Sequence, residues 1–309
     1  MNKYLILSST LDFSTDYVCV EMEKRGLDYL RINRDQLSDY KVVYDVQKKE
    51  LHISYHDMIH RITDDDLKAV FFRAPVFIRS NKVYSLEDQL RRSQWSSFIR
   101  NLTVFSSAKW LNHPMFTYQA ENKIYQLDVA KNVGLEIPET LISNSAEGIL
   151  KNETYVIKAL DTPLFYENGQ EMFTYTTVIS GANISSSSLH IAPVIIQKCI
   201  NDKVDLRVTV VGDEIYPATI TTHNNGIYGD WRKLKKEDLQ YNRTELPIEI
   251  KEKLLKLMQE MNLSFGGVDL AFANGTYYFI EINPTGEWGW LIPTTGYQIQ
   301  EAIVDWMVQ

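Results

Sequence analysis

The sequence is poor in the features that mark secreted, membrane-spanning and nucleic-acid-binding proteins. Its 309 residues include only two cysteines, Cys19 and Cys199, and their number and separation predict neither a disulfide framework nor a metal cluster. No apolar run approaches the ~18 residues that a membrane span needs, and the apolar run at residues 4–7 is too short for a signal peptide. The net charge of −8 argues against broad nucleic-acid binding, although it is compatible with a local basic cleft for phosphates. We therefore expect a cytoplasmic protein that binds neither membranes nor nucleic acids.

The composition that remains is typical of a globular enzyme. Hydrophobic residues make up 44% of the chain and charged residues 23%, which is enough apolar material for more than one core. At roughly 100–200 residues per domain, this length predicts two or three domains. Residues 110–114, with the sequence WLNHP, indicate a domain boundary, because proline is expected to end regular structure there.

The first third of the chain alternates buried strands with helical patterns. Residues 4–7 and 28–32 predict strands, and residues 15–25 between them predict a helix that ends at Gly26. This order is typical of an α/β domain with a parallel sheet. The other predicted elements are a hairpin at 42–46 and 51–55, a strand at 69–72 and an amphipathic helix at 86–102.

The rest of the chain predicts helices and antiparallel strands. Three strands that follow one another in the sequence are expected to form one antiparallel sheet: 194–200, 206–211 and 214–220. Asn274-Gly275 between two apolar runs is the strongest short hairpin signal. The other predicted elements are helices at 119–133, 246–261 and 302–308, a strand at 155–159 and a Ser-rich surface loop at 183–188.

The hairpin around Asn274-Gly275 carries the most informative polar residues. Glu281 and Asn283 are two apart on one predicted strand, so both point to the same side. Asp269 lies on the preceding strand, nearly opposite them. Two carboxylates and an amide oxygen form a hard oxygen site that suits Mg2+, which prefers few protein ligands together with substrate phosphates. We therefore predict a magnesium site made of these three residues.

The sequences GVD at 267–269 and IEINP at 280–284 resemble the Mg2+-binding signature of the ATP-grasp superfamily of ligases. The resemblance spans roughly residues 112–309 and, more loosely, the whole chain. It implies an α/β, or more broadly α+β, protein with the ATP-grasp fold. The expected parts are an N-terminal parallel α/β domain at 1–112 and two α+β subdomains, at 113–192 and 193–309, that sandwich ATP.

The same resemblance implies a set of nucleotide contacts. Lys123 and Lys158 resemble the first and second phosphate-contacting lysines, and Arg207, in the sequence DLR at 205–207, is expected to face the phosphates. Residues 195–200 resemble the hinge that holds adenine through backbone groups. The superfamily commonly has Glu where Lys198 stands, so the side chain that recognises the base stays open. The implied cofactor-binding residues are Lys123, Lys158, Gln197, Lys198, Cys199, Ile200 and Asp205.

Four further motifs look like those of the graspetide maturases, which are the microviridin-type and grasp-with-spasm ATP-grasp enzymes, with RimK-like ligases as wider relatives. They are FFRAP at 71–75, WLNHP at 110–114, GDWR at 229–232 and NPTGEW at 283–288. These enzymes cross-link Asp or Glu side chains of a ribosomal precursor peptide to Ser/Thr hydroxyls or Lys amines. The resemblance therefore implies a precursor peptide as substrate, with ATP and Mg2+ as cofactors.

Such a ligase activates a carboxylate as an acyl phosphate, so the protein mainly positions groups and neutralises phosphate charge. The residues that we expect to act on the reacting groups are Arg73, Arg207 and Arg232. Arg232 would stabilise the transferring phosphoryl group, and Arg73 would orient the acceptor carboxylate bidentately, unless it pairs with a neighbouring Asp or Glu instead. The general base stays open among His113, His223 and Glu287.

A peptide substrate also needs a docking surface, and residues 165–173 mix apolar anchors with acidic groups. The candidates there are Phe165, Glu167, Asn168 and Glu171, although the segment could equally pack internally as a helix or hairpin. Two other functions compete with a peptide maturase. A RimK-like ligase that adds amino acids to a protein or small molecule would share the same ATP site, and a non-catalytic nucleotide-binding module would share the fold. A homodimer is also possible.

Overall fold

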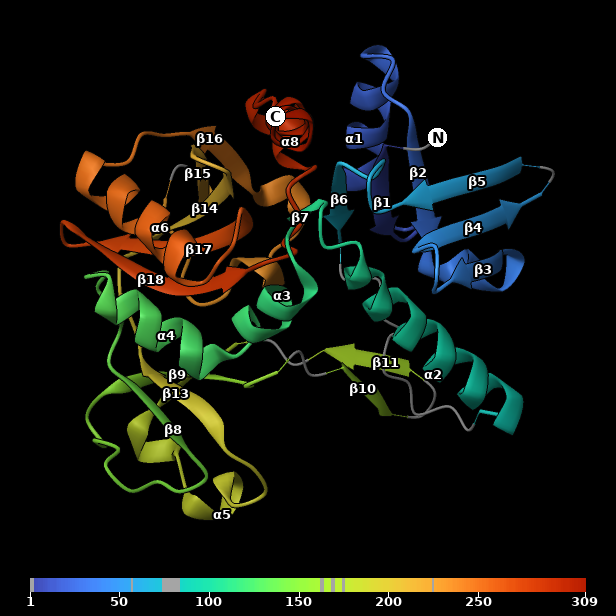
Figure 1. The fold of residues 1–309 in the computed structure, drawn as a ribbon. Coiled ribbons are helices and arrows are strands. Elements are labelled where there is room, and N and C mark those ends of the chain that lie inside the picture. The colour runs from blue at the N-terminus through green and yellow to red at the C-terminus, as the bar shows by residue number, and fades with distance from the viewer. Residues whose placement is uncertain are drawn as a thin grey trace.

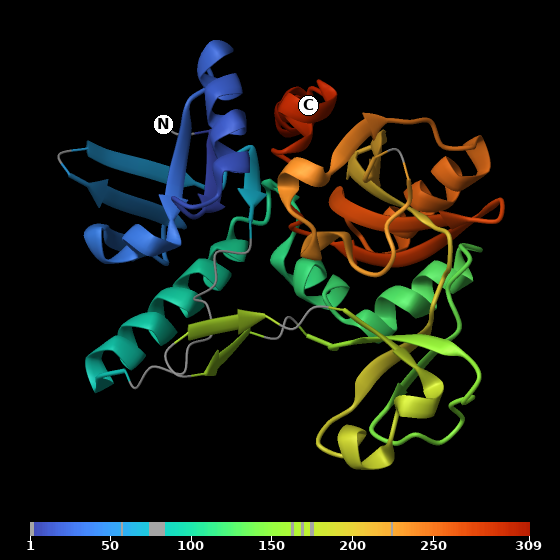
Figure 2. The same ribbon diagram turned by 180° about the vertical axis from the view of Figure 1, so that it is seen from behind.

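The computed structural model describes residues 3–56, 58–73, 84–161, 164–167, 170–173, 176–223 and 225–309. Figure 1 shows the N-terminal part in blue beside the C-terminal part in orange and red, with the green and yellow middle of the chain below the latter. Figure 2 shows the same arrangement from behind. No helix in the described ranges is both long and apolar enough to cross a membrane.

The N-terminal part is built on a parallel sheet, as its strand–helix–strand sequence predicts. Its strands are β1 (Tyr4–Ser8), β2 (Tyr29–Asn33), β6 (Ala69–Phe72) and β7 (Lys109–Leu111), in the order β2-β1-β6-β7. Its helices are α1 (Phe13–Lys24) and α2 (Leu86–Asn101). Residues of β1 and β6 are fully buried, because layers cover both faces of the sheet. The predicted hairpin is present as β3 (Lys41–Asp45) and β4 (Glu50–Tyr55), and a third strand, β5 (Met58–Thr63), extends it.

The middle of the chain differs from the prediction in its helix. The predicted helix at 119–133 is two helices, α3 (Pro114–Ala120) and α4 (Lys123–Asn132). Asn122 adopts an extended conformation and forms the N-cap of α4. Because its backbone angles are not helical, the helix is interrupted between α3 and α4. Pro114 begins α3 instead of ending regular structure, because its missing N–H is not needed at the first helical position. The Ser-rich segment predicted as a loop contains short helices, η3 (Gly181–Asn183) and α5 (Ser186–Leu189).

The central antiparallel sheet has the strand order β12-β9-β13-β8. Its strands are β8 (Thr140–Ser143), β9 (Thr154–Lys158), β12 (Thr177–Ser180) and β13 (Val194–Lys198). The prediction that β13 continues into the next two strands is therefore wrong, since it pairs with β8 and β9 instead. Periodicity predicts a strand but not its partner, which depends on tertiary contacts. A separate hairpin consists of β10 (Leu164–Glu167) and β11 (Gln170–Phe173).

The C-terminal part is a five-stranded antiparallel sheet in the order β16-β15-β14-β17-β18. Its strands are β14 (Val204–Val211), β15 (Glu214–Thr221), β16 (Gln240–Arg243), β17 (Phe265–Ala273) and β18 (Thr276–Asn283). Asn274 and Gly275 both have positive φ, 50° and 78°, so the predicted turn between β17 and β18 is confirmed. Helices α6 (Ile248–Glu260), α7 (Leu291–Thr295) and α8 (Ile299–Val308) complete it. The domain boundaries at residues 112 and 192 stay a prediction.

Apolar packing joins the N-terminal part and α4 to the C-terminal sheet. Side chains of α4 and α6, among them Val129, Leu254 and Met258, form a core with Val208 and Phe279 of the C-terminal sheet. A second core joins β1, α1 and β6 to α8, and Trp288 lies within it without exposed surface. The strands that carry the predicted metal ligands are therefore held between α4 on one side and the N-terminal part on another.

Candidate active site

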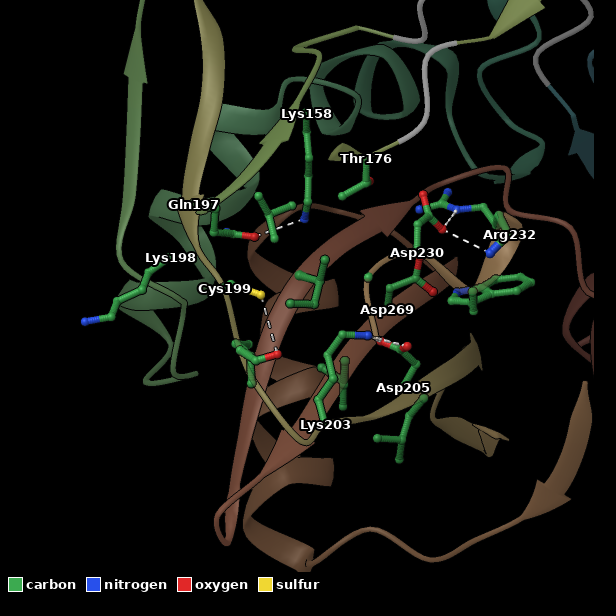
Figure 3. Close-up of a pocket in the computed structure, with 17 residues that line it drawn as sticks. Lys158, Thr176, Gln197, Lys198, Cys199, Lys203, Asp205, Asp230, Arg232 and Asp269 are labelled. Carbon is green, nitrogen blue, oxygen red and sulfur yellow. Dashed lines mark hydrogen bonds and ion pairs between the residues drawn. The ribbon is translucent and has the colours of Figure 1, made fainter. Parts of the chain in front are cut away.

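A pocket lies between the central and C-terminal sheets, where the two strands β9 and β13 face β14, β17 and β18 (Figure 3). Most of the predicted nucleotide-site residues contribute to it. Its lining includes Val156, Lys158, Gln197, Cys199, Ile200, Asp205, Leu206, Asp230, Arg232, Asp269, Leu270 and Ile280. The apolar members give a dry wall, and the charged members gather at one end. This combination fits a ligand with an aromatic base and an anionic tail.

Lys158 leaves the end of β9 and enters this pocket, as predicted. Its Nζ donates to Oε1 of Gln197 at 3.0 Å, and Nε2 of Gln197 donates to Oγ1 of Thr140 at 2.9 Å. Burial lowers the pKa of Lys158, and the charges of Glu281 and Asp269 oppose that effect. A buried ammonium with a neutral partner gains from an anion such as a phosphate, because the anion stabilises its charged form.

The hinge differs from the prediction in the direction of one side chain. Lys198 points away from the pocket, and its Nζ donates to Oε1 of Glu153 at 3.0 Å (Figure 3). The backbone N–H groups of Lys198 and Cys199 already donate to the carbonyl oxygens of Glu139 and Thr154, at 2.8 and 2.9 Å. Successive side chains of a strand alternate between its faces, so Gln197 points in while Lys198 points out. Recognition of a base at this hinge is therefore left to its other backbone atoms.

The three predicted metal ligands do come together. Asp269 on β17 is paired directly with Glu281 on β18, next to a bulge at Asp269 and Leu270. Nδ2 of Asn283 donates to Oε1 of Glu281 at 3.2 Å, so the amide oxygen is the atom left for a cation. Oδ1 of Asp269 is buried and accepts no hydrogen bond. A buried carboxylate oxygen without a hydrogen bond, next to a second carboxylate and an amide oxygen, fits a hard cation such as Mg2+.

Cationic side chains surround this acidic pair. Lys123 Nζ lies 3.0 Å from Oε2 of Glu281, Arg232 lies 3.7 Å from Oε1 of Glu281, and Arg207 lies 3.2 Å from Oδ1 of Asp269. Burial raises the pKa of Asp269 to about 6. The positive charge of Arg207 offsets only part of this rise, and the negative charge of Glu281 adds to the rise. Burial acts the same way on Glu281, but Lys123, Arg232 and Lys158 outweigh it and hold its pKa well below the usual range.

Cations therefore outnumber carboxylates around this acidic pair. Lys123, Lys158, Arg207 and Arg232 face Asp269, Glu281 and Asp230, the last being the ion-pair partner of Arg232. The excess positive charge suits a polyphosphate, whose charge would complete the balance. Asp205, a predicted cofactor-binding residue, also lines the pocket, but its carboxylate is ion-paired with Lys203.

Two charged residues of this pocket, Lys203 and Asp230, were not among the predicted site residues. Lys203 directly precedes β14 and stands two positions before Asp205, and in an extended chain this spacing puts both side chains on one side. Asp230 caps the short helix η4 (Trp231–Lys233) and forms an ion pair with Arg232 at 3.0 Å. It belongs to the GDWR motif, to which only Arg232 was assigned a role.

A second pocket opens on the other side of the cationic group. Arg207 and Arg232 line it together with Lys123, Asn283 and Glu287. Among the three candidate general bases, only Glu287 lines either of these two pockets in the described part of the chain. The pocket therefore places two guanidinium groups, together with the carboxylates of Glu121, Asp161 and Glu287, next to the predicted phosphate site.

Arg73 lies behind this second pocket, with only 3% of its side chain exposed. Its Nε is 2.9 Å from Oδ2 of Asp12, and its two terminal nitrogens contact Oε1 of Glu287 at 3.3 Å and the carbonyl oxygen of Gly286 at 3.4 Å. The alternative that Arg73 pairs with neighbouring carboxylates is thus observed. The guanidinium ties the N-terminal part to the loop that follows Asn283.

The predicted peptide-docking segment forms the hairpin β10–β11, one of the two forms expected for it. Phe165 and Glu167 are on β10, and Glu171 is on β11. Asn168 lies outside the described residues.

Comparison with known proteins agrees with this geometry. The family model of the RimK-like ATP-grasp domain matches residues 120–307, which is more than half of the chain. A search of curated proteins gives no significant match. Among solved structures, a RiPP-associated ATP-grasp ligase from Chryseobacterium gregarium, in complex with ADP and a leader and core peptide, is 27% identical with a TM-score of 0.87, over 100% of this chain and 97% of that one.

Two further structures cover the whole chain. The macrocyclase MdnC from Microcystis aeruginosa MRC, bound with the precursor peptide MdnA, is 27% identical with a TM-score of 0.83, over 99% of both chains. The ligase PsnB, complexed with a variant of its minimal precursor, Mg and ADP, is 16% identical with a TM-score of 0.76, over 100% of this chain and 98% of that one. The likeness to PsnB concerns the fold alone.

The fold and the site together define an ADP-forming ligase with the ATP-grasp fold. This chain belongs to the RimK-like ATP-grasp family, and within it the chain is similar to peptide macrocyclases at about 27% identity. The predicted fold class and the predicted superfamily are therefore confirmed.

Replacing Lys158 by methionine is expected to weaken nucleotide binding. Methionine has a similar length but no charge, so the substitution removes a buried cation from the pocket. Hydrogen bonds to charged groups contribute roughly 1.5–3 kcal/mol, so we expect a loss of about 10- to 100-fold in ADP affinity by calorimetry. Lys251→Met, which removes a lysine paired with the exposed Glu245, is the matched control and should bind ADP normally. Unchanged affinity in Lys158→Met would remove Lys158 from the nucleotide site.

Proposed function

We propose that this ligase forms ester or amide cross-links between side chains of a ribosomally made precursor peptide. The observation that carries the proposal is the second pocket, which adjoins the cationic end of the first and presents Arg207, Arg232 and Glu287. A ligase needs such a place for an acceptor carboxylate and a nucleophile beside the phosphates. The full-length likeness to two ligases whose structures hold precursor-derived peptides supports the same conclusion.

The chemistry requires activation of a carboxylate, which by itself is a poor electrophile because its leaving group would be oxide. Transfer of the γ-phosphate gives an acyl phosphate, and attack by a hydroxyl or amine releases phosphate and forms the ester or amide. Asp269, Glu281 and Asn283 would hold Mg2+, which neutralises phosphate charge when bound. Lys123 and Lys158 would hold the phosphates as point charges.

The arginines divide the remaining tasks. Arg232 lines both pockets and would stabilise the transferring phosphoryl group, and Arg207 would face the same phosphates. An acceptor carboxylate could reach Arg73 only by displacing Glu287. The ion pair of Arg73 with Glu287 is longer than its ion pair with Asp12, and Glu287 is the more exposed of the two carboxylates. We therefore propose that Arg73 acts on the acceptor in exchange with Glu287.

The leader part of the peptide would dock on the hairpin β10–β11. This proposal rests on the composition of residues 165–173, which mixes aromatic and acidic residues around Phe165, Glu167, Asn168 and Glu171. Such a surface would suit a segment with aromatic and basic residues.

Co-expression with a candidate precursor tests the function. Each cross-link removes one water, so the peptide mass should fall by one or more waters, and fragmentation should fail inside the ring. ATP consumption should rise when the peptide is added. A gain in mass by whole amino-acid residues would instead establish a ligase that extends its substrate. An enzyme that consumes no ATP with any peptide would be a nucleotide-binding module, and the proposal would be wrong.

A further inference from the structure

Strand β18 carries Glu281 and Asn283 at the edge of its sheet. Ile282 stands between these two residues, and its backbone N–H and C=O point sideways out of the strand. An edge strand has no neighbouring strand on one side to pair such groups, and a buried backbone group left unpaired is unfavourable. The position of both predicted metal ligands therefore depends on what contacts this edge.

A buried glutamine on α4 takes the place of the missing strand. Gln126 donates from Nε2 to the carbonyl oxygen of Ile282 at 2.8 Å and accepts from the N–H of Ile282 at 3.1 Å. These are the two hydrogen bonds that an adjacent strand residue would make. A third bond runs from Nε2 to the carbonyl oxygen of Ala120 at 2.6 Å, and only 1% of the residue is exposed. Its side chain is therefore satisfied and held in one orientation.

A second buried amide acts on the other side of Asn283. Asn112, also 1% exposed, donates from Nδ2 to the carbonyl oxygens of Pro284 at 3.0 Å and Phe265 at 2.7 Å. Its Oδ1 accepts from the N–H groups of Ser264 at 2.8 Å and Phe265 at 2.9 Å. Asn112 thus joins the start of β17 to the end of β18, the two strands with the acidic residues. The residues directly before and after Asn283 are each held by a side-chain amide.

We propose that Gln126 and Asn112 are positioning residues, which hold the backbone of residues 282–284 so that Glu281 and Asn283 present their oxygens to a divalent cation. This inference rests on the metal site of the proposed function. Mg2+ demands near-ideal ligand geometry, so a strand edge free to shift would bind it poorly. Residues that orient metal ligands typically contribute 10- to 100-fold to affinity. Lys123, one turn before Gln126 on α4, pairs with Glu281 itself, so one helix orients both side chain and backbone.

Gln126→Met tests the inference, because it removes all three hydrogen bonds with little change in volume. The probe is Mn2+, whose free ion is measured by electron paramagnetic resonance in the presence of ADP. We expect the Mn2+ affinity of the ADP complex to fall about 10- to 100-fold. The affinity for ADP in EDTA should stay within about twofold, since no nucleotide contact is removed. Gln300→Met, which removes another buried amide in α8, is the matched control and should leave Mn2+ affinity unchanged.

The outcomes distinguish a failure of the positioning role from a failure of the metal site. If wild-type protein binds Mn2+ with ADP and Gln126→Met binds it equally well, the positioning role is wrong while the metal site stands. If the wild type binds no Mn2+ with ADP, the metal site is wrong and this inference with it. A loss of ADP affinity in EDTA equal to the loss for Mn2+ would show a merely structural role. Should Gln126→Met fail to fold, Gln126→Asn keeps a buried amide but is one methylene too short to hold both backbone groups of Ile282, and a loss of Mn2+ affinity is again expected.

Discussion

Glu281→Ala is expected to reduce ligation by at least about 10³-fold, which corresponds to about 4 kcal/mol of transition-state stabilisation. Glu281 is the carboxylate with the most cationic neighbours, and burial makes each of those interactions stronger. Its removal takes away a proposed metal ligand and leaves Lys123 without its carboxylate partner, while Arg232 keeps Asp230. Product mass after a fixed time gives the loss of ligation.

The effect on nucleotide binding has a definite sign. Without Mg2+, ADP should bind Glu281→Ala at least as well as the wild type, because one negative charge near the phosphates is gone. With Mg2+, binding should be weaker than in the wild type. The control is Glu245→Ala, which removes the carboxylate of an exposed ion pair with Lys251 and should leave ligation unchanged. Full turnover by a folded Glu281→Ala protein, checked by circular dichroism, would contradict the metal assignment.

Arg232→Lys should lower turnover by about 10²- to 10³-fold, the range measured when one stabilising donor is removed from an active site. Arg232 lines both pockets, so its guanidinium would lie between nucleotide and acceptor in the proposed reaction. Burial alone would lower its pKa, but the charges of Asp269, Glu281 and Asp230 outweigh burial and raise it, so the group stays charged throughout the reaction. A lysine keeps the charge but loses the planar fork. ADP affinity should therefore change much less than kcat.

Arg243→Lys is the matched control for this substitution. Arg243 on β16 stacks on Tyr297 at 4.5 Å and lines neither of the two pockets, so its replacement should leave turnover unchanged. If Arg232→Lys loses ADP affinity and turnover in equal proportion, Arg232 belongs to the nucleotide site alone. If it loses neither, the account of the phosphoryl-transfer step is wrong.

Local sequence signals predicted the β17–β18 hairpin and the acidic centre of the site, but they did not predict which strands pair within each sheet. The β17–β18 hairpin follows from Asn274-Gly275, because few other residues adopt positive φ at both turn positions without strain. The same turn places Asp269 opposite Glu281, so the acidic centre of the site could be predicted from spacing alone. Lys158 and Gln197 were instead predicted from the resemblance to the ATP-grasp superfamily, and the structure places them in hydrogen-bond contact. The conclusions about the hairpin depend on residues close in sequence and on the two-residue period of a strand.

Other features depend on contacts between residues far apart in the sequence, and no local pattern reveals them. Strand β13 joins the central sheet because β8 and β9 offer it partners, although its own residues would suit either sheet. Arg73 pairs with Asp12 within the N-terminal part and with Glu287 across the boundary to the C-terminal part. Gln126 reaches Ile282 over 156 residues of sequence, and as one of several polar residues in α4 it gave no signal. The sequence by itself therefore determined which groups are the candidates for the chemistry, whereas tertiary packing alone decided which neighbours hold them in place, because a buried polar group takes its partner from whatever element lies against it.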